Sequence, residues 1–220
     1  MQANLKNFLE KVERKTEELR QNPPEDQITP IYDPTEEQQV ANEMVKIWNS
    51  SYNLDFDRFL EICLAVLERR EEDYQNLVKD LKKETLSIYT KLFGLLLKFF
   101  TYDYHYGDPL GTFYMQTQSY GRNGEYYTPY PVCYCMAKML NPEPNKKVLD
   151  PCVGSGAMLL ATRQVIHEKH GWVESSRFGR NLYGMDISNN AVRMAKIQLY
   201  LTDYIYMSLL LIDTLQKFIK

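Results

Sequence analysis

Hydrophobic side chains recur at helical spacing through most of the first 100 residues. Residues 5–19 place an apolar stripe on one face and lysine and glutamate side chains on the others, which predicts an amphipathic helix. The sequence Thr-Glu-Glu-Gln that begins at Thr35 is a capping box and predicts the start of a second helix. Further helices are predicted after Asp55 and over residues 74–100. Residues 1–100 therefore predict an all-helical domain, arranged as a bundle.

Short apolar runs and amphipathic segments alternate in the second half of the chain. The predicted elements are, in order, a strand over 146–150, a helix over 157–169, a strand over 181–186, a helix that Ser188 caps and a strand over 206–212. This β-α-β-α-β order predicts a parallel sheet with buried strands, whose ligands bind beyond the C-terminal ends of the strands. Residues 101–220 therefore predict an α/β domain that follows the helical one.

The first predicted strand runs into a loop with an acid, a proline and two spaced glycines. Pro151 ends the hydrogen bonding of the strand because it has no N–H group. Gly154 and Gly156 permit positive φ angles and a close approach of the backbone to a ligand. The following helix begins at Ser155 or Gly156, so its N-terminus points at the ligand position. The loop therefore predicts a binding site for a nucleotide-like ligand.

The second predicted strand also ends in an acid, Asp186. In nucleotide-binding folds, an acid at this position accepts hydrogen bonds from ribose hydroxyl groups. The distance along the chain from the glycines is longer than the ~20 residues of the dinucleotide fingerprint, and the loop is not Gly-x-Gly-x-x-Gly. NAD is therefore a weaker candidate for the ligand.

Several pieces of the sequence, in one order, resemble DNA adenine methyltransferases, especially the modification subunits of type I restriction systems. The segment Asp150-Pro151-Cys152-Val153-Gly154-Ser155-Gly156 resembles the Asp-Pro-x-x-Gly-Ser-Gly loop of that family. Tyr127-Thr128-Pro129 resembles its Phe/Tyr-Thr-Pro element, and the segment from Asp108 to Tyr114 resembles the Asp-x-Leu-Gly-x-x-Tyr segment that leads into the domain. The resemblance covers roughly residues 100 to 215.

The resemblance implies a cofactor, S-adenosylmethionine (SAM), and a class I SAM-methyltransferase fold. Residues 101–220 would form a Rossmann-like domain with a parallel sheet, incomplete at its C-terminal end. The family's Phe/Tyr-Thr-Pro element helps hold the methionine end of SAM, its strand-end acid binds the ribose, and Asp213 resembles the acid near the adenine. The implied cofactor-binding residues are Tyr127, Thr128, Pro129, Asp150, Pro151, Cys152, Gly154, Ser155, Gly156, Asp186, Ile187 and Asp213.

The catalytic motif of the family is not visible in this chain. The family carries Asp/Asn-Pro-Pro-aromatic on the strand after the last one predicted here, and the chain stops at Lys220. The consecutive prolines Pro23 and Pro24 are followed by Glu25 where the aromatic residue belongs, although permuted methyltransferases do carry this motif first. We therefore assign no catalytic residue.

Three functions remain open from the sequence. In the first, the chain is the SAM-binding portion of a site-specific DNA adenine methyltransferase, a fragment or split subunit that is truncated before the motif. In the second, it is a non-catalytic SAM-binding or regulatory protein on the same scaffold. The third, nucleotide or NAD binding without methyl transfer, leaves the Thr-Pro element and Asp213 unexplained. Under the first function, a partner subunit or further C-terminal region would supply the catalytic and target-recognition elements.

Composition and charge restrict the partners. Apolar residues make up 44% of the 220 residues and charged residues 25%, as in ordinary globular proteins. Residues 1–90 have a net charge of −7 and residues 91–220 a net charge of +4, so DNA is expected to approach the second half or a partner chain. No run approaches the about 18 apolar residues of a membrane span, and the N-terminus lacks the apolar core of a signal peptide. We expect a cytoplasmic protein without membrane contact.

The cysteine and histidine residues give no pattern of a metal site. Cys63, Cys133, Cys135 and Cys152 do not have the paired spacing of a disulfide framework or a zinc site, which favours ordinary packed thiols. His167 and His170 are one residue short of the zinc-protease spacing, and we expect both at the surface near the end of a helix. Trp172 to Asn181 is expected to be an excursion between that helix and the next strand.

Overall fold

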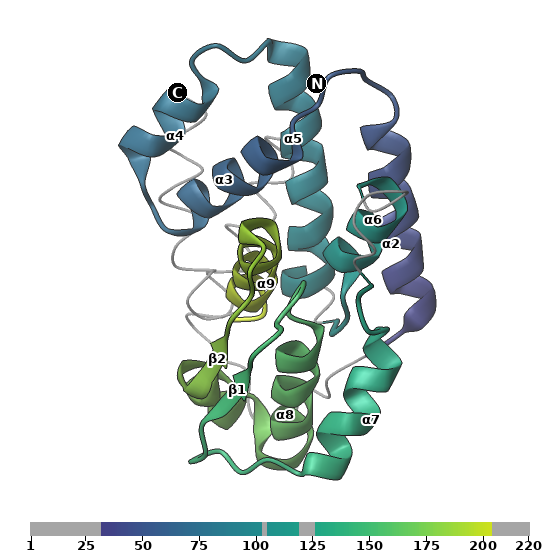
Figure 1. The fold of residues 1–220 in the computed structure, drawn as a ribbon, viewed down its shortest axis with the longest axis vertical. Coiled ribbons are helices and arrows are strands. Elements are labelled where there is room, and N and C mark those ends of the chain that lie inside the picture. Colours follow the sequence, from purple (N-terminus) through teal and green to yellow (C-terminus); the bar gives the residue numbers. More distant parts are fainter. Residues whose placement is uncertain (1–31, 103–104, 119–125, 204–220) are drawn as a thin grey trace.

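The computed structural model describes residues 32–102, 105–118 and 126–203. The first part contains α2 (Pro34–Trp48), α3 (Phe56–Leu67), α4 (Glu71–Val78), α5 (Lys83–Leu97), a π-helical turn η1 (Lys98–Tyr102) and α6 (Pro109–Thr117). The second contains α7 (Tyr130–Leu140), β1 (Val148–Asp150), α8 (Ala157–Phe178), a 3₁₀ turn η2 (Gly179–Asn181), β2 (Leu182–Gly184) and α9 (Asn189–Leu201). Figure 1 shows α2 to α6 in one half of the molecule and α7, α8 and the strands in the other, with α9 between them.

The predicted helices of the first part are confirmed, with two corrections to their bounds. Asp33, not Thr35, caps α2, because its carboxylate accepts the backbone N–H of Thr35 at 2.7 Å and Pro34 occupies the first helical position. The region from Tyr74 to Phe100 is divided, since α4 ends at Val78 and α5 begins at Lys83. The predicted helix over residues 5–19 lies outside the described residues.

One hydrophobic core joins helices from both halves of the sequence. The side chain of Phe113 on α6 is fully buried, and its ring lies 5.6 Å from that of Trp48 on α2 and 6.0 Å from that of Phe56 on α3. The same core continues to Leu160 on α8 and Ile197 on α9. The division into domains of residues 1–100 and 101–220 stays a prediction.

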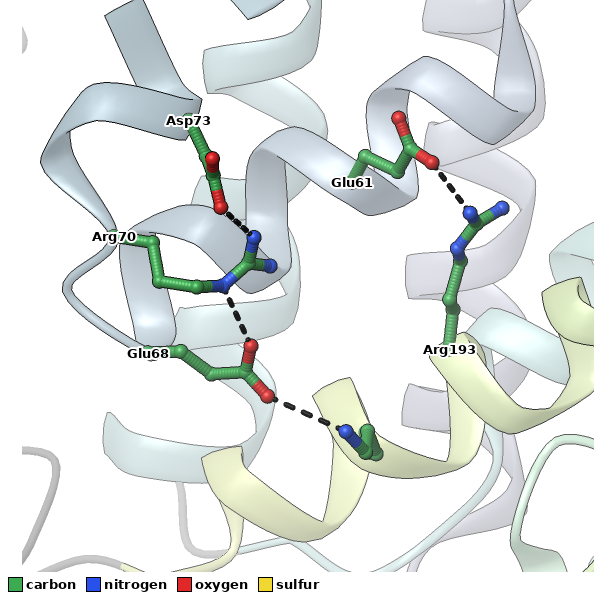
Figure 2. Close-up of polar contacts among 6 residues, drawn as sticks. Glu61, Glu68, Arg70, Asp73 and Arg193 are labelled. Carbon is green, nitrogen blue, oxygen red and sulfur yellow. Dashed lines mark hydrogen bonds and ion pairs between the residues drawn. The ribbon is translucent and has the colours of Figure 1, made fainter.

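A ladder of polar contacts holds α9 against α3 (Figure 2). Arg193 on α9 pairs with Glu61 on α3, and Lys196 lies 3.5 Å from Glu68, which also binds Arg70 at 2.9 Å. These side chains are partly exposed, so each pair contributes about 0.2 to 1 kcal/mol at most. These ion pairs therefore add little to the stability of the contact between α3 and α9.

β1 and β2 form a parallel pair connected through α8. Val148 lies opposite Leu182, and Leu149 lies opposite Tyr183. Val148 and Leu182 pack against a small core made by Val153, Leu159 and Ala195. This β-α-β unit confirms the predicted order of the first two strands, and the predicted strand over 206–212 lies outside the described residues.

The opposite face of the two-stranded sheet is open. Leu149 is 56% exposed and Tyr183 is 45% exposed, so the prediction of buried strands is wrong for this face. The physical reason is that α8 and α9 lie on one side, and no described segment covers the other side.

α8 extends further than the sequence predicts. Gly171, with φ of 81° and ψ of 172°, interrupts the helix, but the chain becomes helical again from Trp172 to Phe178 instead of forming an excursion. The prediction of a surface position is wrong for His167, which is buried, with its Nδ1 3.2 Å from the hydroxyl of Tyr106. The residues that follow the kink fold back over this part of α8, since the hydroxyl of Ser175 donates to the carbonyl of Arg163 at 3.1 Å.

Candidate cofactor-binding site

The loop between β1 and α8 has the predicted strand, turn and helix order. The Asp150 carboxylate accepts the backbone N–H of Cys152 at 3.0 Å and so tightens the first turn. Gly154 and Gly156 have φ angles of 51° and 95°, in the left-handed region that favours glycine. Gly156 is the residue before α8, and a Cβ there would lie 3.0 Å from the backbone of Ala195. The second glycine therefore lets the start of α8 pack closely on α9.

Asp186, which follows β2, lies beside this loop. Its Oδ2 accepts the backbone N–H of Gly154 at 3.0 Å, and its Oδ1 accepts that of Ser188 at 2.9 Å. The backbone pairing of β1 and β2 continues beyond the ends of the strands. The Val153 N–H donates to the Met185 carbonyl at 2.8 Å, and the Met185 N–H donates to the Asp150 carbonyl at 2.9 Å. A carboxylate has about four lone-pair positions, so Asp186 keeps the capacity to accept ligand hydroxyl groups.

The Tyr-Thr-Pro element reaches the same loop. The ring of Tyr127 covers Gly154 so closely that a Cβ on that glycine would lie 3.2 Å from ring atom Cδ1. The ring also stacks on Tyr114 of α6, with centroids 5.5 Å apart and an angle of 21° between the planes. Thr128 and Pro129 are exposed and lead directly into α7. The structure thus brings together Tyr127, Gly154 and Asp186, which are far apart in the sequence.

The remaining predicted site residues differ in exposure. Pro151, Cys152 and Ile187 are exposed around the loop and strand end, so they are accessible to a ligand. Ser155 is buried, and its hydroxyl donates to the carboxylate of Asp108. Asp213 lies outside the described residues. The cofactor-binding roles of all these residues stay predictions.

A buried polar network beneath the loop joins Asp108 to two residues that the sequence does not single out, Glu37 and Gln198. Asp108 caps α6, and its Oδ1 accepts the backbone N–H of Gly111 at 3.0 Å and the side-chain amide of Gln198 on α9 at 2.7 Å. Glu37 on α2 accepts a hydrogen bond from the hydroxyl of Thr112 at 3.0 Å. The sequence Asp-Pro could identify Asp108 as a helix cap. Nothing in the sequence identifies Glu37 or Gln198, because a polar residue on an amphipathic helix normally faces solvent.

Burial shifts the titration of both carboxyl groups in this network. Desolvation raises the pKa of Asp108 to about 6, against the opposing effect of hydrogen bonds from Gln198, Ser155 and Gly111. Desolvation, and then the charge of Asp108, raise the pKa of Glu37 to about 7. Both groups therefore favour the protonated form in the folded protein more than in the unfolded chain.

These shifts predict a pH dependence of stability. Unfolded Asp and Glu side chains titrate near pH 4, so between about pH 4 and pH 7 the folded protein binds more protons than the unfolded chain. The stabilising contribution is complete below pH 4 and is lost as the pH rises through the folded-state values. We expect Glu37→Gln to reduce the loss of unfolding free energy between pH 4.5 and 7.5 by up to roughly 3 kcal/mol, measured by urea titration. Identical pH dependence in the variant and the wild type would contradict the raised pKa of Glu37.

Comparison with known proteins identifies the family. The family model for N-6 DNA Methylase matches residues 108–217, which is half of the chain. The chain belongs to the N-6 DNA methylase family. The matched range begins at Asp108 and contains Tyr127, the glycine loop and Asp186. The resemblance to a type I modification subunit seen in the sequence is confirmed.

A type I methylase subunit is similar in sequence to this chain. This N-6 DNA methylase chain is 28% identical over 169 residues to the type I restriction enzyme MjaVII methylase subunit of Methanocaldococcus jannaschii. The match covers 74% of this chain and 26% of the relative, so the chain spans about a quarter of the relative's length. No solved structure matches the chain significantly.

The described residues contain neither a membrane-spanning helix nor a cluster of metal ligands. Among residues 32–102, 105–118 and 126–203, no helix has the length and apolar character needed to cross a membrane. Within these ranges there is also no group of three or more His, Cys, Asp or Glu side chains that could hold a metal ion.

Proposed function

We propose that the chain is the SAM-binding portion of a DNA adenine methyltransferase of the type I modification-subunit kind. The observation that carries this proposal is the hydrogen bond from the Gly154 N–H to Asp186 Oδ2, which joins the glycine loop and the strand-end acid in one site. Tyr127, from the Tyr-Thr-Pro element, covers the same glycine. Three family motifs thus meet at the C-terminal ends of two parallel strands, where ligands of such folds bind.

The residues present fit SAM. Gly154 adopts a left-handed conformation and has no Cβ, so Tyr127 can lie close against the loop backbone. The loop leads into the start of α8, and a helix N-terminus favours a negatively charged group such as the methionine carboxylate. Asp186 would accept hydrogen bonds from the ribose hydroxyls, and exposed Ile187 would contact the adenine. Thr128 and Pro129 would border the methionine end. SAM supplies an activated methyl group on its sulfonium, and the loop and Asp186 would fix the position of that group.

The complete parallel sheet belongs to the same proposal. β1 and β2 supply the first two strands of a class I SAM-methyltransferase sheet, and residues 206–212 would supply the third. Asp213 follows directly on that segment, where it would lie near the adenine of SAM. The open face of Leu149 and Tyr183 is consistent with further elements that pack there, since parallel sheets are usually covered on both faces.

We place the methyl-transfer step outside this chain. Methylation of an exocyclic amine requires the base to be held in line with the sulfonium methyl. The sequence contains no Asp/Asn-Pro-Pro-aromatic motif, and it spans 26% of the M. jannaschii subunit. Another segment or subunit would supply that motif and the recognition of the DNA target. DNA would approach the positively charged second half in a cytoplasmic assembly.

A second candidate is a non-catalytic SAM-binding or regulatory protein on the same scaffold. The missing motif favours it, and the site geometry is the same in both cases. Transfer of a labelled methyl group from SAM to unmethylated DNA separates the two. We expect background incorporation by the chain alone, and incorporation into adenine when a polypeptide carrying the Asn-Pro-Pro-aromatic segment is added. If the reconstituted mixture binds SAM but incorporates no label, the non-catalytic protein is favoured. If the chain alone incorporates label, the methyl-transfer step does not need another segment or subunit.

A further inference from the structure

The side chain of Ser155 points from the cofactor loop into the protein interior. It is 1% exposed, and its hydroxyl donates to Oδ2 of Asp108, which lies 47 residues earlier in the sequence. The neighbouring Gly154 N–H donates to Asp186. Two adjacent residues of the loop are therefore held by carboxylates from two different elements.

Gln198 completes the attachment of Ser155 from a third element. This fully buried side chain on α9 donates through Nε2 to Asp108 Oδ1 at 2.7 Å and to the backbone carbonyl of Ser155 at 2.9 Å. Its Oε1 accepts the backbone N–H of Leu110 at 3.1 Å. Both ends of the amide are thus engaged, which fixes its orientation.

Gly111, beside this network, has no room for a side chain. A Cβ on Gly111 would lie 2.2 Å from Oδ2 of Asp108 and 2.5 Å from the hydroxyl of Ser155, so any larger residue there would separate the two. A buried network of this kind is costly when one partner is removed, because the other donors and acceptors stay desolvated and unpaired. Without the Asp108 carboxylate, three donors would lose this acceptor: the Ser155 hydroxyl, the Gln198 amide and the Gly111 N–H.

From this geometry we propose that Asp108 and Gln198 are positioning residues, which set the conformation of the cofactor loop through Ser155 without touching the cofactor. The inference rests on the proposed SAM site. The Ser155 peptide adjoins the Gly154 N–H that Asp186 holds, so movement at Ser155 displaces the backbone that faces the ligand. α6 and α9 thereby control the affinity of a site formed mainly by the β1–α8 loop and the end of β2.

The test compares affinities for S-adenosylhomocysteine (SAH) by calorimetry, at a temperature where every variant is folded by circular dichroism. We expect Asp108→Ala to weaken SAH binding about tenfold or more, and Ser155→Ala to weaken it about threefold or more. Asp108→Asn should stay within about twofold of wild type. Its carboxamide oxygen accepts from Gly111 and Gln198, and its NH₂ group donates to the Ser155 hydroxyl, which can rotate to accept.

Ser175→Ala is the matched control. It also removes a fully buried serine hydroxyl, which donates to the Arg163 carbonyl beyond the Gly171 kink of α8, so its SAH affinity should equal that of wild type. If Asp108→Ala does not fold, Ser155→Ala and Asp108→Asn still decide the matter. Wild-type affinity in the folded Asp108→Ala or Ser155→Ala variant would overturn this inference alone. Absence of SAH binding by the wild type would instead overturn the proposed function on which it rests.

Discussion

Asp186→Ala is expected to weaken SAM binding at least about 100-fold. The side chain would accept two ribose hydroxyl groups, and a hydrogen bond to a charged group is worth about 1.5 to 3 kcal/mol, so loss of both removes roughly 3 kcal/mol or more. The substitution also releases the Gly154 N–H, which Asp186 holds at 3.0 Å. Both effects lower the affinity, and calorimetric titration with SAM measures their sum.

Asp203→Ala provides the matched control for this prediction. Asp203 is also a partly exposed acid that binds neighbouring elements, since it accepts the hydroxyl of Ser176 at 2.7 Å and lies 3.6 Å from Arg163. It lies just beyond the far end of α9 from Asp186. We expect it to lose some stability and to keep the SAM affinity of the wild type. Equal affinities of Asp186→Ala and the wild type would show that the acid does not bind the cofactor.

Among these variants, Phe113→Ala should lower the free energy of unfolding the most, by about 3 to 5 kcal/mol. The ring is fully buried between Trp48 and Phe56, so its removal loses apolar burial and leaves a cavity where α2, α3 and α6 meet. In a chain of this size, such a loss lowers the melting temperature by roughly 10 °C. Urea and thermal unfolding followed by circular dichroism measure both quantities.

Tyr52→Ala is the control for Phe113→Ala, because Tyr52 is 93% exposed and its loss should change stability by less than about 0.5 kcal/mol. If the helical and α/β regions unfold as one unit, Phe113→Ala should shift a single transition. Two separate transitions, with only the first shifted, would support independent domains. A loss below 1 kcal/mol would contradict the packing of Phe113.

Local sequence signals predicted the parts of the fold that depend on local physics. Ser188 caps α9 as expected, because its hydroxyl accepts the backbone N–H of Ala191 at 3.4 Å. The sequence favours Thr35 as the cap of α2, but Asp33 caps it. Both are good N-cap residues, and Pro34 at the first helical position decides between them. The glycine loop was identified for the same local reason, since its residues allow backbone angles that few others adopt.

Long-range contacts explain what could not be predicted. Gln198 and Asp108 lie 90 residues apart, and nothing near either residue in the sequence shows that they bind each other. His167 is buried because the chain folds back after Gly171, a tertiary effect that its charged neighbours Glu168 and Lys169 conceal. The exposure of Leu149 likewise depends on which segments cover the sheet.

Calorimetric titration of the wild-type chain with SAH, with NAD⁺ as the competing ligand, tests the proposed SAM site most directly. We expect saturable heat at one SAH per chain, no heat with NAD⁺, and displacement of SAH by SAM. Absence of heat with both SAH and SAM, or binding of NAD⁺ in their place, would contradict the assignment of the β1–α8 loop and Asp186 as a SAM site.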